Sequence, residues 1–233
     1  MAQPVKPKRS YDSTRRREQA ASTRADIVEA ARTLFERQGY AQTTMAAIAQ
    51  EAGVALKTVY LAFETKAGVL RALWNALLRG GVDEPPITEH PWHQEMLDEH
   101  DAERQLRLNA RNSRAGKERI GRAYQVIRAA ADEDADAAAL WSRIQTDYHA
   151  NQRAVVESLR RKRALARGLS VDRGADILWT LNHPDVWQLL VVERGWTPEQ
   201  YERWCADSAC AQLLQSGSTA SPTRTRPGRS TSR

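Results

Sequence analysis

Apolar residues recur at helical spacing along almost the whole segment from residue 22 to residue 215. In its first stretch, the i, i+3, i+4, i+7 and i+8 positions of an amphipathic helix are occupied by Ile27, Ala30, Ala31, Leu34 and Phe35. No stretch alternates convincingly with the period of two that is typical of a half-buried strand. The pattern therefore predicts an all-α protein.

Capping residues and glycines divide the N-terminal part into four expected helices. Their limits are Ser22 or Thr23 to Gly39, Thr43 or Thr44 to Gly53, residues 56–61, and Thr65 to Gly80. The run "GGVDEPPITEHP" then interrupts the helical pattern, because its prolines and glycines cannot continue a helix. We expect a domain boundary near this run.

Six further amphipathic helices are expected beyond the boundary. Their spans are 92–111, 115–131, 133–164, 172–182, 185–193 and 198–215. Pro184 and Pro198 each suit the first position of a new helix. The acidic run from Asp132 to Asp136 precedes a long helix and complements its dipole, so we interpret it as a cap rather than a metal site.

The net charge of +6 is concentrated at the two ends of the chain. Residues 1–20 hold six bases and two acids, and residues 216–233 hold four arginines and no acid. We expect a basic disordered arm over 1–20, a helix-turn-helix domain over 21–81, a larger helical domain over 82–215, and a basic disordered tail over 216–233. A basic arm ahead of a folded domain suits a polyanion such as DNA.

Several classes of protein are not indicated by the sequence. The N-terminus lacks the apolar segment of a signal peptide, and no apolar run is long enough to span a membrane, so we expect a cytoplasmic, nucleoid-associated protein with no membrane partner. Cys205 and Cys210 lie five residues apart and would face different sides of a helix, which suits a reducing compartment. No hydrolase, metalloprotease or dinucleotide motif is present, and we expect no cofactor and no enzyme activity.

The segment "TTMAAIAQEAGVALKTVYLAFETKAGVL" predicts a helix-turn-helix over residues 44–63. Small residues allow its two helices to approach closely, and Gly53 suits the left-handed backbone that the turn needs. Val54, Val59 and Ile48 are expected to form the core beneath the recognition helix. The exposed side would then carry Ala55, Leu56, Lys57, Thr58, Tyr60 and Leu61. Lys57 would reach a guanine edge or a phosphate, Thr58 a base or its methyl group, and Tyr60 a phosphate oxygen.

The order of residues over about 23–75 resembles the N-terminal DNA-binding domain of the TetR family of transcriptional regulators. The similarity rests on "AARTLFERQGY", "TTMAAIA", "AGV", "TVYLAF" and the lysine that follows. Two positions depart from the family pattern: Ala55 replaces a capping serine, and Ala62 replaces an aromatic residue or histidine that would supply a phosphate donor.

This resemblance implies a sequence-specific regulator, a dimeric repressor that a small apolar or aromatic ligand releases from a pseudo-palindromic operator. It implies phosphate contacts by Thr44 and Lys66, and major-groove positions for Lys57, Thr58 and Tyr60. The expected DNA-binding residues are Thr43, Thr44, Ala55, Leu56, Lys57, Thr58, Tyr60, Lys66, Arg15, Arg16, Arg17 and Arg24. An alternative is an architectural DNA-binding protein without ligand control.

The larger domain suggests two further sites. An aromatic ligand pocket is expected from Trp92, Tyr124, Trp141, Tyr148 and Trp179, although these residues would equally fill a core. The closing helices resemble the dimerisation helices of the same family, and their expected interface residues are Ile177, Leu181, Trp187, Leu190, Trp204 and Leu213, with an intramolecular core as the alternative. The histidines at 90, 93 and 100 lie in a polar, solvated stretch, and we expect no metal there.

Overall fold

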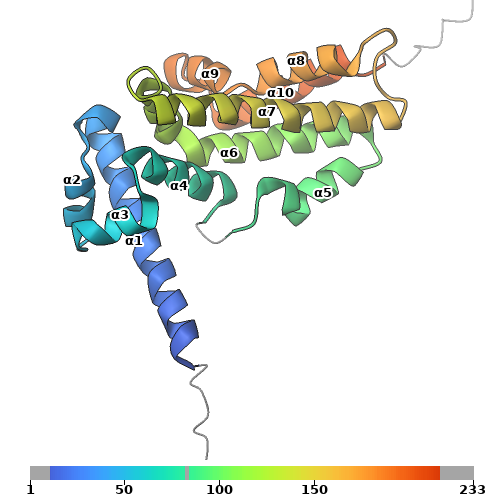
Figure 1. Ribbon diagram of the computed structural model, residues 1–233. Helices are drawn as coiled ribbons and strands as arrows, with labels where there is room; N and C mark the ends of the chain where they lie inside the picture. The colour runs from blue at the N-terminus through green and yellow to red at the C-terminus, as the bar shows by residue number, and fades with distance from the viewer. Residues whose placement is uncertain (1–10, 82–83, 216–233) are drawn as a thin grey trace, which may run out of the picture.

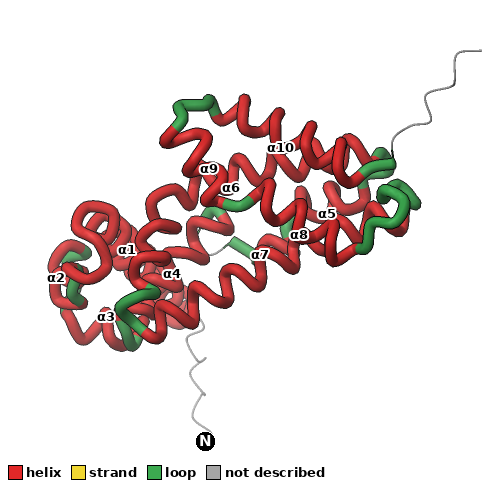
Figure 2. Tube along the Cα trace, turned by 90° about the horizontal axis from the view of Figure 1, so that it is seen from above, coloured by secondary structure: helices red, strands yellow, loops and turns green. Residues whose placement is uncertain are grey.

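The computed structural model describes residues 11–81 and 84–215, and within these residues it contains helices and no β-strand (Figures 1 and 2). The all-α prediction is confirmed. The expected tail at 216–233 and the first ten residues of the expected arm lie outside the described residues.

The N-terminal domain consists of four helices, α1 (Tyr11–Gln42), α2 (Met45–Glu51), α3 (Leu56–Phe63) and α4 (Lys66–Arg79). They assemble around a buried apolar cluster that includes Phe35, Ile48, Val59 and Leu70. A kink at Gly39, where φ is 79°, turns the end of α1 toward α2. The long α1 projects beyond α2 and α3 in Figure 1, so its first turns extend away from the rest of the domain.

The larger domain is built on two long helices, α6 (Ala102–Ala130) and α7 (Ala135–Arg161), which lie side by side in Figure 1. The other elements pack around this pair. They are η1 (Ile87–Glu89), α5 (Pro91–Asp98), α8 (Val171–Asn182), α9 (Pro184–Trp187), the π-helical turn η2 (Gln188–Glu193) and α10 (Pro198–Leu213).

The two domains share one of the two apolar cores. The cluster around α1 and α4 continues through Ile120 and Ile127 of α6 to Leu140 and Ile144 of α7. The second cluster joins α5, the first half of α6, the second half of α7, α8 and α10. Because the first core crosses the domain boundary, the N-terminal helices are packed directly on α6 and α7.

Two expected helix limits are wrong. The first helix begins at Tyr11 rather than beside Ser22, because the run from Thr14 to Ala21 has no glycine or proline to stop it. The part of the expected disordered arm from residue 11 to residue 20 is therefore helical. The expected helices 92–111 and 115–131 are also divided differently: the break falls at residues 99–101, where Asp101 accepts a hydrogen bond from the Arg104 amide at 2.7 Å, and α6 continues through Gly116.

Other local predictions are confirmed. Asp134 caps α7 by accepting bonds from the amides of Asp136 and Ala137, and Thr65 caps α4. Gly80 ends α4 in the left-handed conformation, with φ at 94°. Pro184 and Pro198 each occupy the first turn of a helix.

Close approach of α3 and α4 depends on Gly68. A Cβ atom added at this residue would lie 2.1 Å from the carbonyl oxygen of Phe63, a backbone atom that cannot rotate away. We expect Gly68→Ala to lower the free energy of unfolding by about 1–3 kcal/mol, as overpacking typically does. The matched control is Gly116→Ala in the interior of α6, where an added Cβ meets nothing within 4 Å. This control should stabilise the protein by about 0.5–1 kcal/mol. Urea unfolding of both variants is the measurement, and equal effects would contradict the assigned contact.

Candidate DNA-binding surface and internal cavity

The geometry of α2, the turn and α3 follows from a few local interactions. Thr44 caps α2 by accepting a hydrogen bond from the Ala47 amide at 3.1 Å. Gly53 adopts the left-handed backbone of the turn, with φ at 65°. Ala55 begins α3 without a side-chain cap, as its sequence predicts. Ile48 and Val59 are fully buried between the helices, so the angle between α2 and α3 is set by their packing.

One face of α3 is exposed although it is largely apolar. Leu56 is 41% exposed, Tyr60 is 49% exposed and Leu61 is 76% exposed, and Lys57 lies beside them. These residues are one, four and five positions apart, so they share one side of the helix. Thr58 is only partly exposed. Large side chains gathered on an exposed face mark an interaction surface.

The basic residues of α1 fall into two groups, one exposed to solvent and one in contact with α3. Arg15, Arg16 and Arg17 are exposed on the projecting first turns of α1 (Figure 1). Arg24 instead clamps α1 to the end of α3: its Nη1 donates to the Ala62 carbonyl at 2.7 Å, and its guanidinium lies 4.2 Å from the centre of the Phe63 ring. Arg24 therefore acts first as a positioning residue.

Two of the expected DNA contacts also make contacts within the N-terminal domain, where Thr43 is buried and Lys66 is partly exposed. Thr43 has no exposed surface, and its hydroxyl donates to the Gly39 carbonyl at 2.8 Å. The Lys66 ammonium donates to the Tyr40 carbonyl at 2.8 Å and lies 4.0 Å from the Tyr40 ring centre. Both contacts use backbone carbonyls at the kink of α1, those of Gly39 and Tyr40. Burial lowers the pKa of Lys66.

A hydrogen bond links the N-terminal helices to the larger domain. The Tyr40 hydroxyl donates to Oδ2 of Asp134 at 2.7 Å, and Asp134 is the residue that caps α7. Burial, together with this bond, raises the pKa of Tyr40, and the same bond is the main cause of a lowered pKa at Asp134. The sequence contains no local signal for this pair, because its members lie 94 residues apart.

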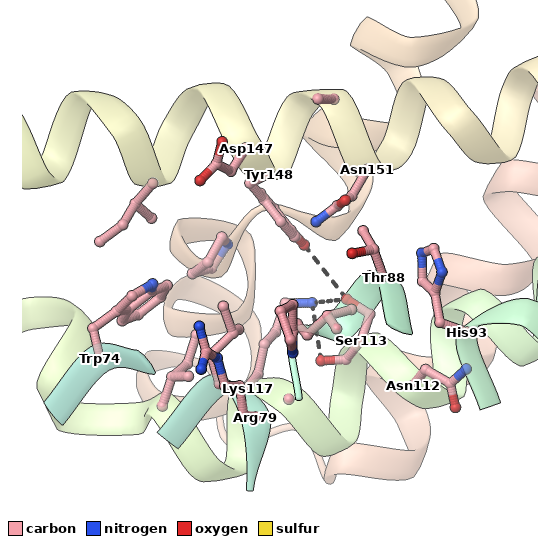
Figure 3. Close-up of a pocket in the computed structure, with 18 of the residues that line it drawn as sticks. Trp74, Arg79, Thr88, His93, Asn112, Ser113, Lys117, Asp147, Tyr148 and Asn151 are labelled. Carbon is pink, nitrogen blue, oxygen red and sulfur yellow. Dashed lines mark hydrogen bonds between the residues drawn. The ribbon is translucent and has the colours of Figure 1, made fainter. Parts of the chain in front are cut away.

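A cavity of about 500 Å³ lies between α4, the segment around α5, α6 and α7 (Figure 3). Three of the expected aromatic residues, Trp92, Tyr124 and Tyr148, line it. Trp141 and Trp179 do not. Trp141 packs against Tyr124 with ring centres 5.1 Å apart, and Trp179 packs against His183 at 4.6 Å, so both fill the core around the cavity.

Several residues that line the cavity were not predicted from the sequence. Arg71 and Trp74 come from α4, and Ser113 and Lys117 come from α6. Ser113 and Lys117 lie on α6 where residues of α4 and α7 line the same cavity. A lysine with only 3% of its surface exposed is the clearest departure from a solvated helix.

The expected interface residues of the closing helices divide into two groups. Leu213 is completely buried and Leu181 is 9% exposed, so both belong to the intramolecular core and not to an open face. Ile177, Trp187, Leu190 and Trp204 are partly exposed. Leu189 and Val192, which the sequence analysis did not select, are the most exposed large apolar side chains of this region, at 52% and 60%.

Other chemistry receives no support from the described residues. They contain no group of three or more acidic, histidine or cysteine side chains arranged to hold a metal. They also contain no helix with the length and hydropathy of a membrane span. Cys205 is buried and Cys210 is partly buried, and both thiols are free.

Comparisons with known proteins agree with this geometry. Residues 27–73 match the family described as bacterial regulatory proteins, tetR family. The transcriptional regulator TtgR of Pseudomonas putida is 44% identical over 63 residues, which cover 27% of this chain and 30% of TtgR. That match spans less than a third of the relative.

Solved structures share the fold over most of the chain. A TetR transcription regulator from Haloarcula marismortui aligns with a TM-score of 0.62 and 18% identity, covering 83% of this chain and 99% of that one. SmeT, the repressor of the multidrug efflux pump SmeDEF of Stenotrophomonas maltophilia, aligns with a TM-score of 0.64 and 19% identity, over 85% and 93% of the two chains. SmeT in complex with triclosan aligns with a TM-score of 0.63 and 19% identity, over 90% and 100%.

The matched residues 27–73 include the kink at Gly39, the turn at Gly53 and the exposed face of α3. The N-terminal domain of this chain is therefore a TetR-family DNA-binding domain, carried on a chain with the fold of TetR-family regulators.

Proposed function

We propose that this protein is a transcriptional regulator that binds a pseudo-palindromic operator as a homodimer and releases it when a small molecule fills the cavity. The observation that carries this proposal is the exposed face of α3, which Ile48 and Val59 hold rigidly on a buried core. A two-turn helix presented in this way suits the major groove of DNA.

The residues around α3 supply both kinds of DNA contact. Lys57 is suited to a guanine edge, and Leu56 and Leu61 to the methyl groups of thymine. Thr44 and Tyr60 carry hydroxyls for phosphate oxygens, and Thr58 is suited to a base or its methyl group. Arg15, Arg16 and Arg17 extend along α1 and add positive charge, which contributes affinity that does not depend on sequence. Ala55 offers only its backbone and a small contact surface.

Dimerisation is proposed through the apolar surface near the end of the chain. Leu189 and Val192 are exposed there, and the partly exposed Trp187, Leu190 and Trp204 lie in the same elements or pack beside them. One short recognition helix reads only a few base pairs, so two copies are needed for a specific site.

Ligand control is proposed through the helices that border the cavity. Both α4 and α7 line it, and α4 follows α3 directly while the cap of α7 holds Tyr40. A molecule that moves α4 relative to α7 would therefore move the recognition helix. SmeT, which shares this fold, is a repressor whose complex with triclosan has been solved, and this supports a small-molecule ligand for the present chain.

The role of Lys57 can be separated from that of Tyr60. Lys57→Ala should relax the preference at one base pair and weaken the preferred site by about 1–3 kcal/mol. Tyr60→Phe should weaken all sites alike by about 1 kcal/mol, because it removes one phosphate hydrogen bond. Selection of bound duplexes from a random pool, followed by affinity titration, measures both effects. Arg160→Ala removes a charge at the far end of α7 and serves as the control.

Two outcomes would contradict these assignments. If Lys57→Ala selects the same sequence as the unmodified protein, Lys57 does not read a base. If the unmodified protein selects no preferred duplex, the protein is an architectural DNA-binding protein.

The dimer surface is tested by adding charge to its exposed apolar residues. Leu189→Glu together with Val192→Glu should shift the protein from dimer to monomer at micromolar concentration, because two carboxylates would have to be buried in the interface. Thr146→Glu, on an exposed face of α7, should leave the dimer intact. Sedimentation equilibrium distinguishes the states. If the double variant sediments as a dimer, the interface does not include Leu189 and Val192.

The link between Tyr40 and Asp134 is expected to carry the response between the domains. Binding of the selected duplex should slow amide exchange at the start of α7, and Tyr40→Phe should remove this effect while α3 remains protected by DNA. The Tyr40 ring still packs on Phe35, with centres 5.7 Å apart, so the fold is retained. Tyr60→Phe, at saturating DNA, is the matched control because it removes an exposed hydroxyl. Equal protection of α7 in both variants would exclude the proposed route.

A further inference from the structure

Lys117 is a buried cation without a buried anion beside it. Its side chain is 3% exposed, and its ammonium donates to the Ser113 hydroxyl and contacts the Ser113 carbonyl at 3.5 Å. Its nitrogen also lies 5.2 Å from the centre of the Tyr201 ring. Among residues 11–81 and 84–215, no carboxylate lies within ion-pairing distance of it. Burying an unpaired charge is costly, so this arrangement needs a functional reason.

The groups that face Lys117 do not neutralise it. Tyr201 and Cys205 come from α10, Tyr148 from α7, and His183 precedes α9. Burial raises the pKa of both tyrosines, raises the pKa of Cys205 to about 11, and lowers the pKa of His183, so all four are uncharged near pH 7. Burial likewise lowers the pKa of Lys117 to about 7. A bound anion would therefore favour the charged form of Lys117, which no group of the chain does fully.

The cavity lining has the same electrostatic character. Its described residues include five bases, of which Arg71, Arg79, Arg119 and Arg143 accompany Lys117, but only one acid, Asp147. Asp147 lies 3.6 Å from Arg143 on an exposed part of α7. A concave site lined by charges of one sign attracts ligands of the other sign.

The remaining lining combines aromatic and apolar side chains with neutral polar ones such as Asn112, Gln145 and Asn151, and two buried polar atoms of the lining have no hydrogen-bond partner. The indole and phenol rings of Trp74, Trp92 and Tyr124 form much of it. Nδ1 of His93 and the hydroxyl of Tyr124 are buried and have no hydrogen-bond partner among the described residues. Figure 3 shows Lys117 and Ser113 opposite Tyr148, with His93 farther along the same cavity. A volume of about 500 Å³ suits a molecule of two or three fused rings.

We propose that the cavity binds an aromatic carboxylic acid, whose carboxylate pairs with Lys117 beside the hydroxyl of Ser113 and whose rings pack against Trp74, Trp92 and Tyr124. This assignment rests on the ligand-responsive function proposed above and names the chemical class of its ligand. The carboxylate would take the place of the water that normally solvates an ammonium group. The buried charge of Lys117 would then select acids over uncharged molecules of similar shape.

Matched acid and amide probes test the proposal. The probes are 2-naphthoic acid and 9-anthracenecarboxylic acid, each beside its carboxamide of nearly equal shape. For the unmodified protein, calorimetry should give affinities about 10–100-fold higher for the acids, as a charge-assisted pair predicts. Lys117→Met should bind acid and amide alike. It should also melt no lower than the unmodified protein, because an unpaired buried charge has been removed. Arg143→Met removes an exposed cation of the same lining and should retain most of the preference for the acids.

Proton uptake gives a second readout. At pH 8 most Lys117 side chains are neutral in the free protein, since their pKa is about 7. A bound carboxylate raises that pKa, so binding should take up protons at pH 8 and should weaken as the pH rises further. Calorimetry in buffers of different ionisation enthalpy measures the uptake, which Lys117→Met should abolish.

Equal binding of acids and amides by the unmodified protein, or an acid preference that survives Lys117→Met, would overturn the proposal. So would the absence of binding by every acid of the series. None of these results touches the selection of a preferred duplex. Conversely, loss of any DNA preference with retained acid binding would refute the proposed regulator and leave this ligand class standing.

Discussion

The apolar core that α1 and α4 share with α6 and α7 is the constraint on which the rest of the structure depends. The Tyr40 to Asp134 hydrogen bond closes this core at the start of α7. Because a densely packed core resists gradual deformation, a displacement of α4 or α7 is passed to its neighbours rather than absorbed. The recognition helix is thereby placed by helices that also border the cavity, which is the geometry that a ligand-controlled DNA-binding protein requires.

The cavity combines two features that a core optimised for stability alone would avoid. It leaves apolar and aromatic side chains without close packing, and it holds Lys117 away from water without an anionic partner. Each feature lowers the stability of the free protein, and the proposed ligand would relieve both by filling the cavity and pairing with the charge. Departures of this kind from good packing are expected at functional sites.

Local features of the fold were predictable because their causes lie within a few residues. Asp134 caps α7 through amides two and three residues ahead, and Gly80 ends α4 because its backbone is left-handed. The break between α5 and α6 was predicted in the wrong place. We expected a break at residues 112–114, but the helix continues there because Asp101 starts it well before and no proline interrupts it.

The sequence by itself determined the all-α class, most helix ends and the helix-turn-helix, since helical periodicity, caps and the ordered residues of the family pattern are all local. Only the tertiary structure decided which side chains are available. Leu181 and Leu213 have the residue types expected for an interface, yet side chains from elsewhere in the chain cover them. The burial of Lys117 and the hydrogen bond of Tyr40 were likewise decided by the tertiary structure, because both depend on groups from helices distant in the chain.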